Sequence, residues 1–304
     1  MKIPRREFLR QSVLLGAAFS VLDVRRGEAV QPGEVPYDMA AVRNGSRVEM
    51  LDAALAALGG LASVVHPGNR VLVKPNIGWD VPPERAANTH PELVGHLVGL
   101  CRKAGAAEVL VCDHTCDEWN RSYTNSGIRA AVEAAGGRMV PGNDEAMYRD
   151  FSTAQGTKLK AGKAHELFLD CQVVINVPVL KHHSGARITA GMKNLMGIVW
   201  DRRFYHQNDL QRCIAETLYV RKPDLTIVDA WHPMVRNGPR GKTVEDVVEM
   251  KMLLASRDPV AVDAAAAKLL GHDPASIGHV KIASELGFGR MDLENLRIAR
   301  LSLG

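Results

Sequence analysis

One stretch decides the fold: Val173-Val-Ile-Asn-Val-Pro-Val-Leu-Lys-His-His-Ser-Gly-Ala-Arg-Ile-Thr-Ala-Gly-Met-Lys-Asn-Leu-Met-Gly197. Residues 173–180 are a nearly continuous run of Val, Ile and Leu, which is typical of a strand buried on both faces of a parallel sheet. The remainder is basic and contains three glycines. Because ligands of open α/β sheets bind beyond the carboxyl ends of the strands, we expect a binding site here. Its candidate residues are Lys181, His182, His183, Arg187, Lys193 and Asn194.

Strands and helices alternate on both sides of this stretch. Short apolar runs predict strands at 71–76, 108–113, 225–229 and 248–256, and amphipathic or alanine-rich segments predict helices at 50–61, 89–105, 126–136, 208–220 and 257–270. Residues 142–163 read as an insertion or a short hairpin, and 200–206 as a surface flap. This order predicts an α/β fold, a mostly parallel open sheet with helices on both faces. We expect residues 30–304 to form a single domain.

Polar residues end three of the other predicted strands. Lys74 and Asn76 end the strand at 71–76, Asp113 ends the strand at 108–113, and Asp229 ends the strand at 225–229. A lysine and an amide at the end of a buried strand suggest anion recognition, although a solvated strand end has the same pattern. Asp113 is open to three roles, as a metal ligand, a proton acceptor or a cap for the loop that follows. Since parallel strands end at one edge of a sheet, we expect Lys74, Asp113 and Asp229, together with Asp263, to face the basic segment.

Two aspartates belong to the predicted helix 257–270. Asp258 precedes Pro259, which is the pattern of a helix N-cap followed by proline at the first helical position. Asp263 lies inside the helix. A buried carboxylate needs a partner, so we expect Asp263 to pair with a lysine of the site.

Residues 1–29 resemble a twin-arginine export signal. Arg5 and Arg6 are followed by Phe8 and Leu9, and then by an apolar segment at 12–22. That segment is too short to span a bilayer, which needs about 20 residues. The resemblance implies the export machinery as a partner, cleavage near Ala29, no membrane span after cleavage, and a periplasmic or other extracytoplasmic location.

Charge and cysteine content exclude several classes of function. The formal net charge is +4, and most of that excess lies in residues 1–29, so nothing indicates nucleic acid as a partner. Neither a phosphate-binding loop of the GxxxxGK type nor a GxGxxG turn is present. The five cysteines form no CxxC pair and no ferredoxin-like run, which leaves no iron–sulfur motif. A divalent metal remains open as a cofactor.

Spaced motifs along the chain together resemble the domain-of-unknown-function 362 family. They are Lys74-Pro-Asn76, Asp113, Lys181-His182, Gly191-Met-Lys-Asn194 with Gly197, Val228-Asp229, Asn237-Gly-Pro239, Asp258-Pro-Val-Ala-Val-Asp263 and Gly287-Phe-Gly289. Many relatives append a ferredoxin-like module, which this chain lacks. The family domain is distantly similar to the N-terminal domain of lactate-racemase-like proteins, which implies a site at the strand ends for a small carboxylate-bearing compound.

The first functional hypothesis is an enzyme that acts on a small anionic, carboxylate- or phosphate-bearing compound. Its candidate catalytic residues are Lys193, Lys181, Asp113 and His182, and its candidate ligand-binding residues are Lys74, Asn76, Asn194, Arg187, Asp229 and Asp263. A lysine surrounded by other cations has a lowered pKa and can act as a base or a Schiff-base nucleophile, and Lys193 is the best placed by sequence.

Two alternatives stand beside the enzyme. The first alternative is a non-catalytic periplasmic ligand- or metal-binding protein, in which His182 and His183 with Asp113 or Asp229 hold a divalent ion. Adjacent residues of an extended chain point to opposite faces, which weakens that ligand set. The other alternative is an accessory factor of an exported redox enzyme.

Overall fold

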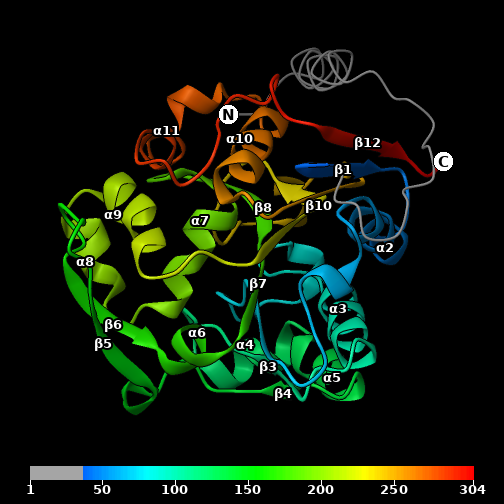
Figure 1. Ribbon diagram of the computed structural model, residues 1–304, viewed down its shortest axis with the longest axis horizontal. Helices are drawn as coiled ribbons and strands as arrows, with labels where there is room; N and C mark the ends of the chain where they lie inside the picture. The colour runs from blue at the N-terminus through cyan, green and yellow to red at the C-terminus, as the bar shows by residue number, and fades with distance from the viewer. Residues whose placement is uncertain (1–36) are drawn as a thin grey trace.

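The computed structural model describes residues 37–304, and the predicted export signal at 1–29 lies outside them. One large sheet forms the centre of the molecule (Figure 1). The order of its main path is β12 (Ile298–Ser302), β1 (Met39–Arg43), β11 (Met252–Ser256), β10 (Leu225–Met234), β7 (Val173–Val177), β2 (Arg70–Pro75), β3 (Glu108–Val111) and β4 (Arg138–Met139).

Most neighbouring strands of this sheet are parallel. The exceptions on the main path are the pairings of β11, which is antiparallel to both β1 and β10. The first and last strands of the described chain, β1 and β12, pair in parallel. The mostly parallel sheet predicted from the sequence is therefore confirmed.

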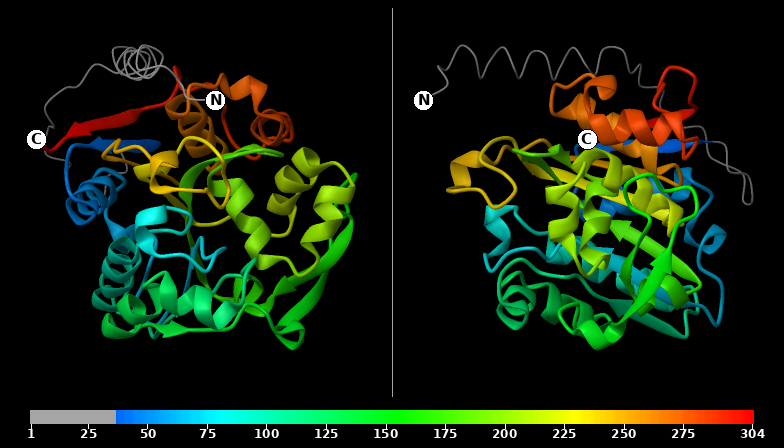
Figure 2. Two further views of the ribbon diagram at one scale, coloured as in Figure 1. Left: turned by 180° about the vertical axis from the view of Figure 1, so that it is seen from behind. Right: turned by 90° about the vertical axis from the view of Figure 1, so that its left-hand side faces the viewer.

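Helices cover both faces of the sheet (Figures 1 and 2). The helices α2 (Arg47–Ala57), α3 (Pro91–Lys103) and α5 (Ile128–Ala134) pack on one face, whereas α7 (Gly191–Asn194), α9 (Leu210–Glu216), α10 (Pro259–Leu269) and α11 (Gly278–Glu285) pack on the other. Strand β2 shows why two cores form, because Val71 and Val73 enter one and Leu72 enters the other. The apolar run is buried on both sides, as a parallel sheet requires.

The predicted strand 173–180 is wrong in one respect, since it consists of two strands. Pro178 separates β7 from β8 (Val179–His183), and its carbonyl oxygen accepts a hydrogen bond of 2.8 Å from the Asp229 backbone N–H. Strand β8 pairs with β10 and with the short strand β9 (Arg187–Thr189), which is antiparallel to it. Lys181, His182 and His183 therefore lie within a strand, where alternate side chains point to opposite faces.

Several other boundaries differ from the sequence prediction. Helix α2 begins at Arg47 because Ser46 and Glu49 form a capping box. Residues 200–206 are no flap, since most of them form helix α8 (Arg202–Gln207), capped by Asp201. The polar insertion is a hairpin of β5 (Tyr148–Ser152) and β6 (Ala161–His165). The remaining helices are α4 (Trp119–Asn125) and α6 (Glu166–Asp170). Across residues 37–304, no helix combines the length and the apolar character needed to cross a membrane.

Candidate functional site

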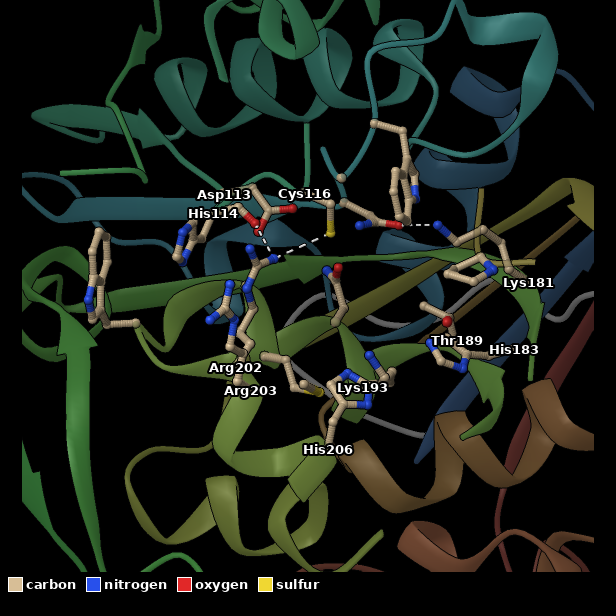
Figure 3. A pocket seen from close by; sticks show the side chains of 18 of the residues that line it. Asp113, His114, Cys116, Lys181, His183, Thr189, Lys193, Arg202, Arg203 and His206 are labelled. Carbon is tan, nitrogen blue, oxygen red and sulfur yellow. Dashed lines mark hydrogen bonds between the residues drawn. The ribbon is translucent and has the colours of Figure 1, made fainter. Parts of the chain in front are cut away.

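A cavity of about 850 Å³ opens at the carboxyl ends of β2 and β3 and beside β8 (Figure 3). Six of the predicted site residues line it, namely Asn76, Asp113, Lys181, His183, Lys193 and Asn194. The other basic side chains of the wall are His114, Arg202, Arg203 and His206. The loop after β2 and helix α8 contribute Trp79 and Asp201. The structure thus gathers cations from segments far apart in the sequence around one hollow.

A buried ion pair lies at the base of the cavity. Lys74 Nζ is 2.8 Å from Asp113 Oδ1, and the two side chains are 0% and 2% exposed. Lys74 Nζ also donates to Pro75 O at 2.7 Å and to Asn194 Oδ1 at 3.1 Å, and Ile77 N donates to Asp113 Oδ2 at 2.7 Å. Burial lowers the pKa of Lys74 and raises the pKa of Asp113, and the attraction between the two groups opposes both shifts.

A ladder of amides continues from this pair beneath the cavity. Asn194 Nδ2 donates to Asn176 Oδ1 at 2.9 Å, and Asn176 Nδ2 donates to Gly191 O at 2.8 Å. Gly197 lies directly against the ion pair, because a Cβ at this position would overlap Asp113 Oδ1 and come within 2.8 Å of Lys74 Nζ. A side chain at 197 is therefore incompatible with the Lys74–Asp113 pair as it stands.

Lys181 is almost fully enclosed, with 1% of its surface exposed. Its Nζ donates to Asn76 Oδ1 and to Ala87 O, both at 2.6 Å. Burial is the main reason why the pKa of Lys181 falls to about 7, with Lys193 and Lys74 adding to the shift and Cys116 and Asp113 opposing it. At neutral pH a large fraction of this amine is uncharged.

Lys193 has a different environment. It lies in α7, it is half-buried, and within residues 37–304 its amine has neither a hydrogen-bond nor an ion-pair partner. Burial lowers its pKa to about 8, and Arg202 and Lys74 contribute to that shift. The lowered pKa was predicted from neighbouring cations, but desolvation is the larger cause.

Beside Lys181, His183 and Thr189 present two further polar groups. His183 Nδ1 accepts hydrogen bonds from Gly185 N at 3.0 Å and Ala186 N at 3.1 Å, so the ring proton of the neutral form is on Nε2. Burial lowers the pKa of His183 to about 3, which keeps the ring neutral. Thr189 is paired with Lys181 in the β8–β9 ladder, and its buried Oγ1 has no hydrogen-bond partner among the described residues.

Arg202 forms the opposite wall. Its two terminal nitrogens donate to His114 O and Thr115 O, both at 2.8 Å, and Nη1 is 3.5 Å from Cys116 Sγ. The His114 ring stacks on Trp200 with centroids 5.0 Å apart, and burial lowers its pKa to about 4. The guanidinium is thus held in place by backbone carbonyls, which leave its positive charge uncompensated.

Lys74, His182 and Arg187, three of the predicted site residues, do not line the cavity. Lys74 lies beneath its floor. His182 shares a ladder position with Ile188, whose side chain is in the core, so it points away from the face of Lys181 and His183. Arg187 is exposed and donates to Ser276 O at 3.1 Å.

Both remaining aspartates are engaged elsewhere. Asp229 pairs with Arg47 at 3.2 Å and is capped by the backbone N–H groups of His90 and Trp231. Asp263 pairs with no lysine, which corrects the prediction, because its oxygens accept from Gly191 N at 2.6 Å and Met192 N at 3.0 Å. Burial raises the pKa of Asp263 to about 7. This carboxyl group fixes the start of α7, which carries Lys193.

The metal-ligand set proposed from the sequence is wrong. His182 and His183 point to opposite faces of β8, and Asp229 is bound to Arg47. Over the described part of the chain, no three His, Cys, Asp or Glu side chains are arranged to hold a metal ion.

The sequence prediction left His183 outside the catalytic and ligand-binding sets and did not include Thr189, Arg202 or Arg203, although all four line the cavity. The alternation of a strand was a usable signal for His183, since it lies two residues after Lys181 and hence on the same face. Thr189 and the two arginines carried no comparable signal, because they reach the site through the β8–β9 turn and through helix α8.

Comparisons with known proteins relate the chain to one family and to two solved folds. It is 29% identical over 259 residues to the thylakoid-associated protein sll1697 of Synechocystis, covering 80% of this chain and 76% of that protein. A structure of the lactate racemase apoprotein from Thermoanaerobacterium thermosaccharolyticum aligns with a TM-score of 0.46 and 9% identity, over 86% of this chain. A Thermotoga maritima protein solved by structural genomics aligns with a TM-score of 0.46 and 11% identity, over 79% of this chain.

The chain spans 60% and 58% of the lengths of these two solved chains. The family model described as "Domain of unknown function (DUF362)" matches residues 71–268. That match includes every predicted site residue and extends over more than half of the 304 residues. The protein belongs to the DUF362 family.

Proposed function

We propose that the protein is an exported enzyme that acts on a small anionic compound, one that carries a carboxylate or a phosphate, in the cavity at the strand ends. The observation that carries this proposal is the set of cations without counter-ions around the hollow. Lys193 has no partner among residues 37–304, and Arg202 is held only by carbonyl oxygens and a sulfur. The two lining carboxylates, Asp113 and Asp201, are already occupied by Lys74 and by the N-terminus of α8.

A cation that is partly removed from water without a counter-ion is destabilised, and a bound anion offsets that cost. The volume of about 850 Å³ lies within the range of small-molecule sites. Groups with shifted pKa values in such a cavity are typical of active sites, and Lys181, Lys193 and His183 all have them. These features support catalysis over simple binding.

The extracytoplasmic location is inferred from residues 1–29, with the export machinery as the partner. The Synechocystis relative is named thylakoid-associated, and that name is compatible with a protein of a membrane-bounded compartment. We infer that residues 30–304 act as one domain, because the pairing of β1 with β12 joins the two ends of the described chain in one sheet.

The proposal is tested by incubating the exported, processed protein with a mixture of small carboxylates and phosphate esters and following each compound by mass spectrometry. We expect the wild type to consume at least one anionic compound and Lys193→Met to consume it at least tenfold more slowly. Lys268→Met removes an exposed lysine of α10 and is the matched control. An anion that stays bound without turnover would instead identify a binding protein. If Lys193→Met binds and converts the anion as the wild type does, the proposed site is wrong.

A further inference from the structure

The three lysines of the strand ends differ in how many acceptors the protein offers to their amines. Lys74 Nζ has two hydrogen-bond acceptors, Pro75 O and Asn194 Oδ1, and in addition an ion-pair partner, Asp113 Oδ1, at 2.8 Å. Lys181 Nζ has two, Asn76 Oδ1 and Ala87 O. Lys193 Nζ has none among the described residues. An ammonium group carries three hydrogens and a neutral amine carries two, so the three environments suit different protonation states.

The surroundings of Lys74 match an ammonium ion, because a carboxylate oxygen lies 2.8 Å from its nitrogen in addition to the two hydrogen-bond acceptors. Those of Lys181 match a neutral amine. Its two hydrogens are bound by Asn76 and Ala87, and its lone pair takes the remaining tetrahedral position. Lys181 is one of the residues that line the cavity (Figure 3), so a ligand there lies against this side chain.

His183 complements this amine from the same strand face. It lies two residues after Lys181 in β8, which places the two Cα atoms about 7 Å apart. Its Nδ1 is occupied by two backbone N–H groups, so Nε2–H is its free donor. Figure 3 shows Lys193 and Thr189 on the same side of the cavity as His183. A neutral histidine donor beside a base is an arrangement that polarises a carbonyl group.

On the function proposed above, we infer that the substrate is a small carbonyl compound with a carboxylate or phosphate group, and that the site enolises it. Lys181 Nζ is the base, His183 Nε2–H stabilises the enolate oxygen, and Lys193 binds the anionic group.

The proposed step balances without a further reactant. The C–H bond next to the carbonyl breaks, its proton passes to the lone pair of Lys181 Nζ, and its electron pair forms the C=C bond of an enolate. The carbonyl π electrons move to oxygen, which accepts the hydrogen bond from His183. Return of a proton from Lys181 to the same face of that carbon regenerates the carbonyl compound, with solvent hydrogen in place of the original one.

A Schiff base at Lys181 fits the same surroundings less well. An iminium nitrogen keeps a single hydrogen, so either Asn76 Oδ1 or Ala87 O would lose its donor in a buried place. Protonation of the amine keeps both hydrogen bonds and adds a third hydrogen toward the ligand. The lowered pKa of Lys181, about 7, suits a base at neutral pH. The charged groups nearby are Lys193, Lys74 and Asp113, together with the Cys116 thiol.

The first test measures exchange of carbon-bound hydrogen for deuterium. Pyruvate, 2-oxobutyrate and dihydroxyacetone phosphate are incubated with the protein in D₂O, and their α-protons are followed by NMR. We expect exchange of at least one probe to fall at least 100-fold in Lys181→Met. His183→Phe should lower the exchange rate, whereas His183→Gln, which keeps an N–H donor, should retain more of it. Lys268→Met is the control.

The second test needs no substituted protein. Cyanate is a small anion whose conjugate acid carbamylates neutral amines, and the product is found by peptide mass spectrometry. At pH 7.5 we expect Lys181 to react at least tenfold faster than the exposed Lys103 and Lys268, and inorganic phosphate to slow the reaction at Lys181 but not at Lys103 or Lys268. Failure of Lys181 to react ahead of those lysines overturns its assignment as a neutral amine.

If the wild type exchanges all three probes no faster than Lys181→Met does, the enolisation is overturned. If the mixture of anions is still consumed in that case, the proposed function stands and only the reaction class is wrong. If neither exchange nor consumption occurs, the enzyme proposal fails as well.

Discussion

Gly197 occupies the most crowded position beneath the cavity. The hydrogen that stands where other residues carry Cβ faces the Lys74–Asp113 ion pair, and a methyl group there would overlap Asp113 Oδ1. We expect Gly197→Ala to force the pair apart and to lower the free energy of unfolding by about 3–5 kcal/mol, the usual cost of breaking a buried ion pair. Urea denaturation measures this change.

Gly99→Ala is the matched control for that substitution. Gly99 lies inside α3 with nothing within 4 Å of its added Cβ, so alanine should raise stability by up to about 1 kcal/mol. A Gly197→Ala protein as stable as the wild type would show that the floor of the cavity can yield, and the rigid placement of Asp113 would then be wrong.

Individual site residues were predictable where one strand decided their position. Asn76, Asp113 and Lys181 follow or end apolar runs, and all three line the cavity. Asp229 ends a strand in the same way but faces Arg47 instead, and the sequence offered no sign of that partner. A long-range pair of this kind depends on how α2 packs on the sheet, which local pattern does not encode.

The start of helix α10 was predicted correctly from the Asp258–Pro259 pair. Asp258 Oδ1 accepts from Val260 N at 2.8 Å and Ala261 N at 2.9 Å, and Oδ2 accepts from Arg290 N at 2.8 Å. We expect Asp258→Ala to lower the free energy of unfolding by about 1–2 kcal/mol because these donors lose their acceptor. The midpoint of urea unfolding measures the loss.

Asp273→Ala provides the comparison at a second cap. Asp273 caps only the short turn at Pro274–Ser276, with one exposed bond to Ala275 N of 3.1 Å, so its loss should cost less than about 1 kcal/mol. If both substitutions cost the same, the two additional bonds of Asp258, from Ala261 N and Arg290 N, contribute nothing and the C-terminal segment is held by other contacts.

The type of each helix or strand was easier to predict from the sequence than its boundaries. The helices and strands of the α/β pattern were found because burial imposes periods of two and 3.6 residues. The break between β7 and β8 was missed, although Pro178 marks it, because valines on both sides hide the interruption. Helix α8 was missed because its six residues are mostly polar and are held by the Asp201 cap and by packing on α9.

The stability of the whole molecule should depend on pH through its buried lysines and cysteines. The folded-state pKa of Lys181, about 7, is lower than the ordinary value of 10.5. Between these values the unfolded chain binds a proton that the folded protein does not, so stability rises with pH above 7. Burial raises the pKa of Cys101 to about 12 and those of Cys171 and Cys213 to about 11, from 9.0. These thiols favour folding below pH 9, and their contribution is lost as the pH rises further.

The two opposing effects place the expected maximum of stability between about pH 8 and pH 9. From pH 7 to 8.5 the free energy of unfolding should rise by about 1–2 kcal/mol, since one pKa unit corresponds to about 1.4 kcal/mol. Lys181→Met should be less stable overall, because Asn76 Oδ1 and Ala87 O lose their donor, and its stability should rise much less over this range, with only Lys193, whose pKa is about 8, still contributing. Lys268→Met, at an exposed position, should keep the wild-type slope. Urea unfolding at 0.5-unit pH intervals compares the three proteins, and a rise in Lys181→Met as large as that of the wild type would mean that this lysine is charged in the folded protein at pH 8, which would also remove the base from the proposed enolisation.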